Sequence, residues 1–546
     1  MSCAISRITF LFLVLLRLSA FGQVMIDATH EFTDSKFPIL IINTNGQTIV
    51  DTPRRIAHLG VIWNKSGARN QLSDSYNHYD GQIAIELRGS SSAQYPKKQY
   101  RIETQNPDGS NLNVSLLGMP SENDWILYGP YNDQSLLRNV LMYELSNQIG
   151  RYAVRTRYCE LIINNEYKGL YILMEKIKQD KNRVNIAKLD SDDITGDSLT
   201  GGYILKIDKL EGENNSGFYS YGGIVYQYHY PKPADIQSEQ KVYIENYTNQ
   251  FEKCMISSSY NASVTGYSSI IDVSSFVDHF ILNEFSRNVD AYRISAYLFK
   301  NRDDKNGLLN AGPIWDMNLS LGKSFFDIDF YKVEDWSVDY YLDHSWDSYQ
   351  VPFWWVKLSD DPLFMHQVYL RWIDLRQKQL DLDCFFNVID QHAEKIKEAR
   401  IRNFQRWPEV EYGHNYEREI RDLKDWIEDR VEWIDNELLQ YADSTIDENS
   451  GYLPQSIQLL PNYPNPFNSS TTIGYELRSP SSVQLSIFTL TGCRIFELSY
   501  PNQAKGQHFI QWNGMDQDGL FVPSGVYLYT LEGFNRKISG RMVLIK

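Results

Sequence analysis

Two aspartates in the stretch Arg287–Gly322 are the residues of this chain best placed to do chemistry. Asp290 follows an apolar helical run, and Asp316 follows the end of a short predicted strand. Between them, Ala296–Lys300 and Leu308–Ile314 have the pattern of two strands joined by a turn rich in Asp, Asn and Gly. Such a hairpin would bring both carboxylates to one end, where they could bind a divalent cation and a polar substrate. The simpler alternative is that Asp290 caps a turn and Asp316 stabilises a loop.

A second candidate for binding is the small-residue loop and basic strand Arg88–Glu103, RGSSSAQYPKKQYRIE. Backbone N–H groups of such a loop could cradle phosphates, with Arg88, Lys97 or Lys98 supplying positive charge. Gly/Ser loops with a basic flank are also common as solvated turns.

Two further charged residues lie near the ends of predicted elements. Asp133 or Ser135 can cap a helix that runs to about Ile149, and Arg138 on it could face a ligand or pair with a neighbouring acid. Glu175 closes the second strand of a predicted hairpin, and charged residues in that position usually form a solvated rim.

Other segments supply the elements that must position these residues. An Asn-Gly turn predicts a hairpin, and an apolar spacing of three and four residues predicts a buried helical face near the end of a helix-rich region. The predicted strands are Pro38–Asn43, Thr48–Asp51, His58–Trp63 and Gln82–Leu87, and the helical face is Ile420, Leu423, Ile427, Val431, Ile434 and Leu438.

Length, charge and the cysteine pattern limit the class of protein. With 546 residues and a net charge of −16, the chain is long enough for several domains and is an unlikely ligand for a nucleic-acid backbone. Met1–Gly22 has the basic, apolar and small-residue regions of a signal peptide, and no later stretch is apolar enough to span a bilayer. The remaining cysteines show no metal-ligand spacing and are expected to be mostly free and buried: Cys159, Cys254, Cys384 and Cys493.

Four segments, in order along 83–441, resemble the CotH kinase family of secreted, atypical protein kinases. These are RGSSSAQYPKKQYRIE, DWILYGPYNDQSLLRNVLMYEL, the GLYILMEKI–KNRVNI run and the NVDAYR…GPIWDMNLSLG pair. The resemblance implies an α+β, two-lobed kinase-like fold with ATP and Mg²⁺ or Mn²⁺ between the lobes. It makes Asp290 the catalytic Asp and Asp316 the metal ligand, favours Lys98 for the phosphates, and puts Glu175 near the hinge between the lobes.

The metal-binding positions depart from the pattern of the better-known family members. The better-known members look like D-x-x-x-x-N in the catalytic loop and W-D-x-D in the metal loop. In this chain Ser295 stands at the position of the Asn, and Asn318 stands at the position of the second Asp. Both can still coordinate through oxygen, with less negative charge for the cation. A kinase fold that has lost turnover and serves in surface assembly or adhesion is therefore the alternative function. A weaker third possibility, a carbohydrate-active protein, depends only on the abundance of Asp and Trp.

The last part of the chain has a different composition. The polar segment 443–459 is predicted to be a linker, and strand-rich 460–546 is predicted to be a small Ig-like β-sandwich. Its YPNPFN, WNGMDQDG and SGVYLYTL segments resemble the C-terminal sorting domains of type IX secretion cargo, which implies export to the cell surface by that machinery. The predicted layout is a signal peptide at 1–22, a β-rich segment at 23–80, the CotH kinase-like domain at 81–442, the linker and the sorting domain. The expected activity is transfer of the ATP γ-phosphate to Ser or Thr of extracytoplasmic proteins.

Overall fold

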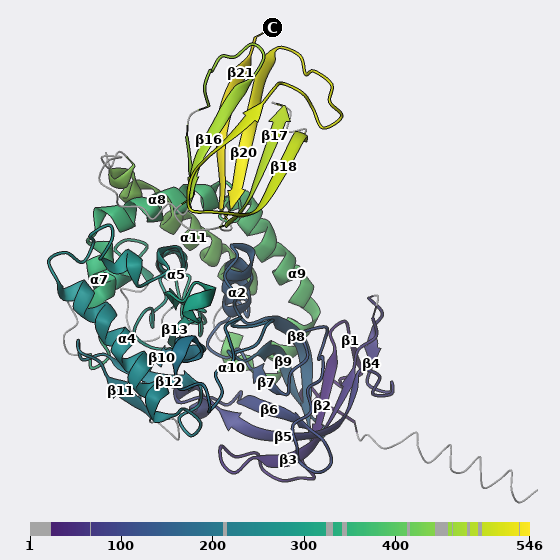
Figure 1. Cartoon of the computed structure of the whole chain (residues 1–546). Helices are drawn as coiled ribbons and strands as arrows, with labels where there is room; N and C mark the ends of the chain where they lie inside the picture. Colours follow the sequence, from purple (N-terminus) through teal and green to yellow (C-terminus); the bar gives the residue numbers. More distant parts are fainter. Residues whose placement is uncertain are drawn as a thin grey trace, which may run out of the picture. The chain divides into compact units, whose positions relative to one another are not determined.

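The computed structural model describes residues 23–65, 67–210, 216–323, 331–340, 347–411, 415–442, 457–460, 462–477, 481–489, 494–533 and 536–545. The predicted signal peptide, most of the predicted linker and Cys493 lie outside these residues. The chain divides into two compact units: the first is 1–261 with 265–445, and the second is 446–546 together with 262–264. The first unit combines helices and strands, and the second is built from strands (Figure 1).

A closed barrel of seven strands forms one part of the first unit. Its strands are β2 (Ile39–Asn43), β3 (Arg55–Ile62), β5 (Tyr79–Arg88), β6 (Gln99–Gln105), β7 (Asp124–Tyr128), β9 (Glu166–Glu175) and β8 (Thr156–Ile163), in that order around the barrel. Neighbouring strands are antiparallel except β2 and β8, whose parallel pairing closes the barrel. Alternate residues of β6 are buried, as expected of a strand with one face on the barrel core. The short strands β1 (Asp34–Ser35) and β4 (Asn70–Gln71) pair separately.

A five-stranded sheet forms the second part of this unit. Its order is β11 (Gly217–Tyr219), β12 (Val225–Tyr230), β10 (Tyr203–Ile207), β13 (Ala296–Lys300) and β14 (Leu309–Ala311). The hairpin predicted between Asp290 and Asp316 is β13–β14, with Leu298 opposite Ala311. β14 is shorter than predicted because the chain leaves the sheet at Gly312 and Pro313.

Helices make up most of the rest of the first unit. They are α2 (Arg138–Gln148), α3 (Gly196–Leu199), α4 (Ser238–Ile256), α5 (Val273–Ser286), α6 (Ser337–Tyr340), α7 (Phe353–Ser359), α8 (Pro362–Arg376), α9 (Leu382–Arg406), α10 (Pro408–Glu411) and α11 (Tyr416–Leu438). Short 3₁₀ turns are η1 (Ser91–Gln94), η3 (Tyr267–Ser269), η4 (Asp303–Lys305) and η6 (Leu439–Tyr441). All six residues of the predicted helical face on α11 are buried, which confirms that prediction.

One local prediction was wrong, and a second was right for the free thiols but not for their burial. The Thr44–Gln47 turn forms, but Thr48–Asp51 is not a strand, because Asn43 of β2 pairs with His58 of β3 across a longer loop. Cys159 is buried and Cys254 is partly buried, whereas Cys384 is exposed; all three are free thiols. Cys384 lies in the first turn of α9 on the side that faces solvent.

The second unit contains two antiparallel sheets. One has the order β15 (Ile457–Leu459), β16 (Thr471–Leu477), β19 (Gly506–Trp512), and the other β18 (Arg494–Gln503), β17 (Ser481–Thr489), β20 (Gly525–Gly533), β21 (Arg536–Leu544). Residues of both sheets share one apolar cluster that includes Ile473, Leu485, Trp512 and Leu531. This arrangement fits an Ig-like sandwich.

Candidate active site

Hydrogen bonds join the loop that carries Asp290 to the loop that carries Asp316. The loop of Asp290 begins where α5 ends, at Arg287, which has the left-handed φ of 45° common at helix C-termini. The backbone N–H of Val289 donates to Leu319 O (3.1 Å), and the N–H of Leu321 donates to Ser286 O (2.6 Å). These bonds bring the neighbourhoods of Asp290 and Asp316 together although the two residues are far apart in the sequence.

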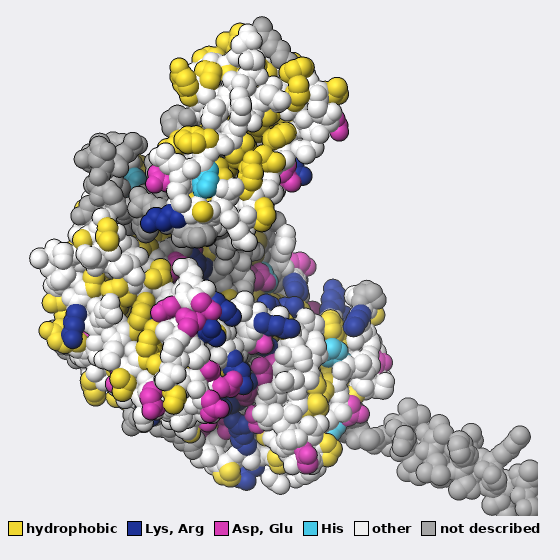
Figure 2. Space-filling view, viewed as in Figure 1, with side chains coloured by type: hydrophobic (Ala, Val, Ile, Leu, Met, Phe, Trp, Pro, Cys, Tyr) yellow, Lys and Arg dark blue, Asp and Glu magenta, His cyan; other side chains and the backbone are white. Residues whose placement is uncertain are grey.

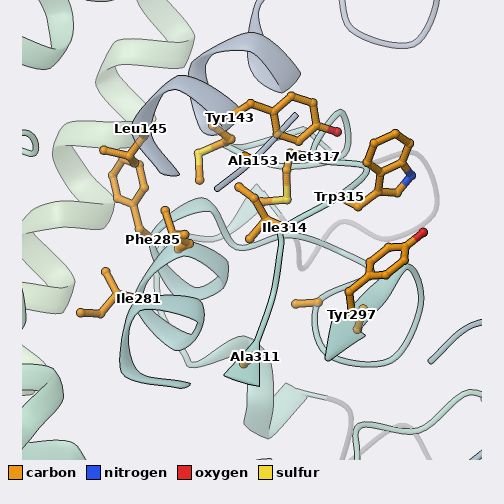
Figure 3. Packing of buried hydrophobic residues seen from close by; sticks show 14 of the residues in the cluster. Tyr143, Leu145, Ala153, Ile281, Phe285, Tyr297, Ala311, Ile314, Trp315 and Met317 are labelled. Carbon is orange, nitrogen blue, oxygen red and sulfur yellow. The ribbon is translucent and has the colours of Figure 1, made fainter. Parts of the chain in front are cut away.

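Helix α2 holds the second loop from the other side. The Asp316 N–H donates to the Tyr143 hydroxyl (3.1 Å), and the Met317 N–H donates to Asn139 Oδ1 (2.7 Å). Trp315 stacks on Tyr143 with ring centroids 6.2 Å apart, whereas Met317 is fully buried (Figure 3). Asp316 itself has a φ of 61°, an unusual conformation for a residue with a side chain. Tyr143 and Asn139 of α2 therefore hold the backbone of Asp316 and Met317 in place.

The sheet brings a third acid to the same place. β10 and β13 pair with Ile207 opposite Ala296, so the residues after β10 lie beside those before β13. Asp208 thus lies near Ser295, which has a φ of 54°. Gly312 N–H donates to Tyr297 O (2.8 Å), so the segment that leads to Asp316 leaves from this end of the sheet too.

Asp290 lies in surroundings that favour its protonated form. Its side chain is 26% exposed, and the Arg293 guanidinium lies 3.5 Å from it. Burial raises the pKa of Asp290 to about 6; Arg293 opposes this, and the negative charges of Asp316 and Asp208 add to it. Arg293 also pairs with Asp347 at 2.9 Å, so its charge is shared between two carboxylates. A carboxyl with such a pKa can take up and release a proton near neutral pH.

Asp316 has a different environment. Its side chain is exposed at the surface of the site. Desolvation by the surrounding protein raises its pKa, which the positive charge of Arg88 opposes and Asp208 reinforces. The Arg88 guanidinium lies over the Trp315 ring, 5.3 Å from its centroid, and donates to Gln99 Oε1 (3.2 Å). Arg88, from the barrel, is therefore the predicted phosphate-binding residue that the structure brings to the aspartates.

Lys98 and Lys97 have different roles. Lys98 Nζ donates to Ala93 O (2.8 Å), so its ammonium lies against the small-residue loop. Lys97 is buried and donates to Leu170 O and to Asn403 Oδ1, both at 2.7 Å, which ties the barrel to α9. Burial lowers the pKa of Lys97 to about 7. Its ammonium is thus engaged inside the protein rather than offered to a ligand.

Arg138 and Glu175 are both buried in ion-pair networks. Arg138 pairs with Asp133 (2.6 Å) and Glu419 (2.8 Å) and donates to the carbonyls of Ser320 and Leu321. It therefore anchors the loop that follows Asp316. Glu175 pairs with Arg155 (3.0 Å) and Arg183 (3.1 Å) at the end of β9.

The sequence analysis missed three residues of this site. They are Lys206, Asp208 and Tyr143. Lys206 and Asp208 form an ion pair, and Lys206 lies 5.9 Å from the Tyr297 ring centroid. The signal available was the segment Tyr203–Lys209, an apolar strand that ends in alternating charges. Nothing in the sequence relates Tyr143 to Asp316. Figure 2 shows basic and acidic side chains mingled in a band across the first unit.

The candidate metal ligands that the described residues bring to this site are oxygen donors. Asp316, Asn318 and Ser295 offer one carboxylate, one amide and one hydroxyl. Among the described residues, no three His, Cys, Asp or Glu side chains are grouped so that they could hold a metal ion. Mg²⁺ usually takes one or two carboxylates together with waters and substrate phosphates, so this donor set fits a cation shared with phosphate rather than one enclosed by protein.

The fold and the site define an α+β protein with paired aspartates at one end of a sheet. Residues 85–434, well over half of the chain, match the family described as CotH kinase protein. The chain belongs to the CotH kinase family. Residues 465–536 match the FlgD Ig-like domain, which agrees with the sheets of the second unit. No helix among the described residues is long and apolar enough to cross a membrane.

Similarity to individual proteins is limited. No curated protein matches the chain. Dimeric latent PorU from Porphyromonas gingivalis is 19% identical over 16% of this chain and 9% of its own, with a TM-score of 0.15. FlgD from P. aeruginosa is 17% identical over 14% of this chain and 64% of its own, with a TM-score of 0.12. FlgD from Xanthomonas campestris is 20% identical over 17% of this chain and 63% of its own, also with a TM-score of 0.12. The chain therefore spans less than two thirds of each of these proteins.

Proposed function

We propose that this chain is a secreted, atypical protein kinase that transfers the γ-phosphate of ATP to Ser or Thr of extracytoplasmic or surface proteins. Family membership supports the class of reaction. The observation that carries the proposal is the pair Asp290 and Asp316, held by two hydrogen-bonded loops beside Arg88. In this proposal the barrel is the smaller lobe and the helix-rich part with the five-stranded sheet is the larger lobe.

Asp290 is the proposed catalytic base. Its pKa of about 6 leaves it mostly ionised at neutral pH, yet basic enough to accept the proton of a substrate hydroxyl. Arg293 orients the carboxylate through its contact at 3.5 Å. Burial above all, and then the negative charge of Asp316, raise the pKa of Asp290 and keep it more basic than an ordinary Asp.

Asp316, with Ser295 and Asn318, would hold Mg²⁺ or Mn²⁺, and Arg88 and Lys98 would hold the ATP phosphates. A bound cation supplies neutralisation of the charge on the transferring phosphoryl group. Tyr143 and Asn139 fix the backbone from which Asp316 projects.

The direct test is phosphotransfer by the purified mature protein with labelled ATP and either Mg²⁺ or Mn²⁺. Incorporation of label into the protein or into added extracytoplasmic proteins is the expected result. Absence of both label transfer and nucleotide binding with either cation would contradict the proposal.

Ser295 and Asn318 favour one alternative, a kinase fold retained for surface assembly or adhesion without turnover. Ser295 and Asn318 both offer neutral oxygens. The pattern of the better-known family members has Asn at the first position and a second acid at the other, so this chain would bind the cation less tightly. Replacing Asn318 by Asp separates the two functions. An active kinase should gain affinity for the cation and keep or raise its rate, whereas the assembly protein should show no transfer in either form.

The predicted signal peptide and the Ig-like domain support export through the type IX secretion machinery. Deletion of 460–546 should leave the chain in the periplasm, because the signal peptide would still act while the sorting domain is missing. The measurement is the distribution of the chain between periplasm and cell surface. The control is a chain that keeps 460–546 and is cut only in the exposed loop at Thr265. Normal surface levels of the deletion variant would contradict the sorting role.

A further inference from the structure

A large open cavity lies against a different face of α2 from the one that contacts the loop of Asp316. It has a volume of about 860 Å³ and is bounded by α2, by β8 of the barrel, by α9, by the segment 36–38 just before β2 and by Trp63 just after β3. Small-molecule sites commonly have volumes of about 300–1,000 Å³. A water takes up about 30 Å³, so the cavity is far larger than a site for one or two ordered waters.

Two buried side chains that line this cavity have polar atoms without a partner. Among the described residues, no group hydrogen-bonds to the hydroxyl of Tyr158 or to Nδ1 of His392. Tyr158 is 6% and His392 is 8% exposed, and both line the cavity. Buried polar atoms nearly always have partners, so two unpaired ones at one cavity call for an explanation.

The hydrogen bond at Nε2 of His392 determines which kind of group can hydrogen-bond to Nδ1 of the same ring. Nε2 lies 2.9 Å from Glu144 Oε2, and a carboxylate only accepts, so Nε2 carries the hydrogen. In the neutral ring, Nδ1 is then a lone-pair acceptor that needs an O–H or N–H donor. The Tyr158 hydroxyl can both donate and accept. An alcohol group satisfies both, since it can donate to Nδ1 and accept from the tyrosine.

The rest of the lining combines charged side chains of both signs with aromatic surface. Three basic and three acidic side chains balance one another: Lys36, Arg157 and Lys395 against Glu144, Asp390 and Glu394. Asp390 and Glu394 are also paired with lysines of their surroundings, at 2.6 and 3.0 Å. Trp63 and Phe37 add aromatic surface, on which the C–H faces of a sugar ring pack well.

We propose that this cavity is a saccharide-binding site, separate from the aspartate pair. Its hydroxyl-reading groups are Tyr158, His392 and Glu144, and Trp63 supplies the stacking surface. The two sites lie against different faces of α2: Asn139 and Tyr143 contact the loop of Asp316, while Val140 and Glu144 line the cavity. The proposal does not depend on kinase activity.

The test is binding of four trisaccharides to the full mature chain, measured by saturation-transfer NMR and calorimetry. The probes are maltotriose, cellotriose, mannotriose and tri-N-acetylchitotriose. At least one should bind, and Tyr158→Phe and His392→Phe should each weaken it by about threefold to tenfold, as expected for loss of one buried hydrogen bond. Tyr219→Phe is the matched control, because it removes the same hydroxyl from a tyrosine that is 73% exposed on β11.

Folding of the variants is checked by their thermal midpoints. Tyr158→Phe should unfold at or above the wild-type temperature, because it removes a buried hydroxyl that has no partner. Asp316→Asn should leave saccharide affinity unchanged even if it abolishes nucleotide binding, so failure of one proposal is separable from failure of the other. No binding of any probe at 10 mM, or binding that Tyr158→Phe and His392→Phe both leave intact, would overturn the saccharide site.

Discussion

The two aspartates of the candidate site have different environments and therefore suit different tasks. Asp290 is mostly buried beside one arginine that it shares with Asp347, and its pKa is raised to about 6. Asp316 is exposed, with Arg88 nearby as the opposing positive charge. A partly buried acid that titrates near neutral pH suits proton transfer, and an exposed carboxylate suits a cation shared with a ligand.

The raised pKa of Asp290 predicts a pH-dependent stability. Between about pH 4, where an unfolded Asp titrates, and about pH 6, the folded state binds more protons than the unfolded state. The free energy of unfolding should therefore fall as pH rises through this window, by up to about 3 kcal/mol from this residue. Asp290→Asn cannot titrate and should lose this contribution. Urea unfolding of both proteins at pH 4, 5, 6 and 7 measures it.

The control for this comparison is Asp192→Asn, which makes the same change at an exposed residue. Its pH dependence should parallel that of the wild type. A stability difference between wild type and Asp290→Asn that is constant from pH 4 to 7 would contradict the assigned environment of Asp290.

At the scale of elements, some features follow from local sequence and others only from the fold. The β13–β14 hairpin and the buried face of α11 were predictable because strand and helix periodicity are local properties. The Asn45-Gly46 turn was predictable, but the strand that pairs with β2 was not. β2 pairs with β3 instead of with Thr48–Asp51, and the Val50 carbonyl accepts a hydrogen bond from the Leu87 N–H of β5. The partners Asp208 and Tyr143 needed the tertiary structure, because sheet order and helix docking place them.

Arg138 is expected to hold α2, α11 and the loop after Asp316 together. Its side chain is 4% exposed and pairs with Asp133 and Glu419, while it donates to Ser320 O. Arg138→Met would leave two acids without this partner, and breaking a buried pair costs about 3–5 kcal/mol. Denaturant unfolding should show a loss of this size.

Arg418→Met on α11 is the matched control. Arg418 is 68% exposed and 3.5 Å from Asp422, so its loss should cost no more than about 1 kcal/mol. Equal effects of the two substitutions would show that Arg138 is not the anchor inferred from its contacts.

At the scale of the whole molecule, the chain consists of a CotH family unit and an Ig-like unit with separate cores. The change in composition after Tyr441 allowed the sequence to predict this division, because a polar segment without apolar periodicity does not build a core. Which residues of the first unit meet in one site was less predictable. Arg88 and Lys97 come from the same basic stretch, yet Arg88 lies over Trp315 while Lys97 is buried against α9.

Limited proteolysis should separate the two units within 443–455, the polar segment of the predicted linker. Two fragments that remain folded, as judged by separate thermal transitions, are the expected result. A chain that is cut in its other exposed loops but resists cleavage between Tyr441 and Leu460 would contradict two independent domains.

The most direct measurement of the central claim compares wild type, Asp290→Asn and Asp316→Asn in nucleotide binding and in phosphotransfer. Thermal shift with and without ATP and Mg²⁺ measures binding, because a ligand of the folded state raises its stability, and labelled ATP measures transfer. We predict that Asp290→Asn retains the shift but loses transfer by about 10²–10⁴-fold, the usual value of general-base catalysis, whereas Asp316→Asn loses the Mg²⁺-dependent shift itself. Wild-type protein that shows neither shift nor transfer with Mg²⁺ or Mn²⁺, or an Asp290→Asn variant that transfers phosphate at the wild-type rate, would contradict the assignment.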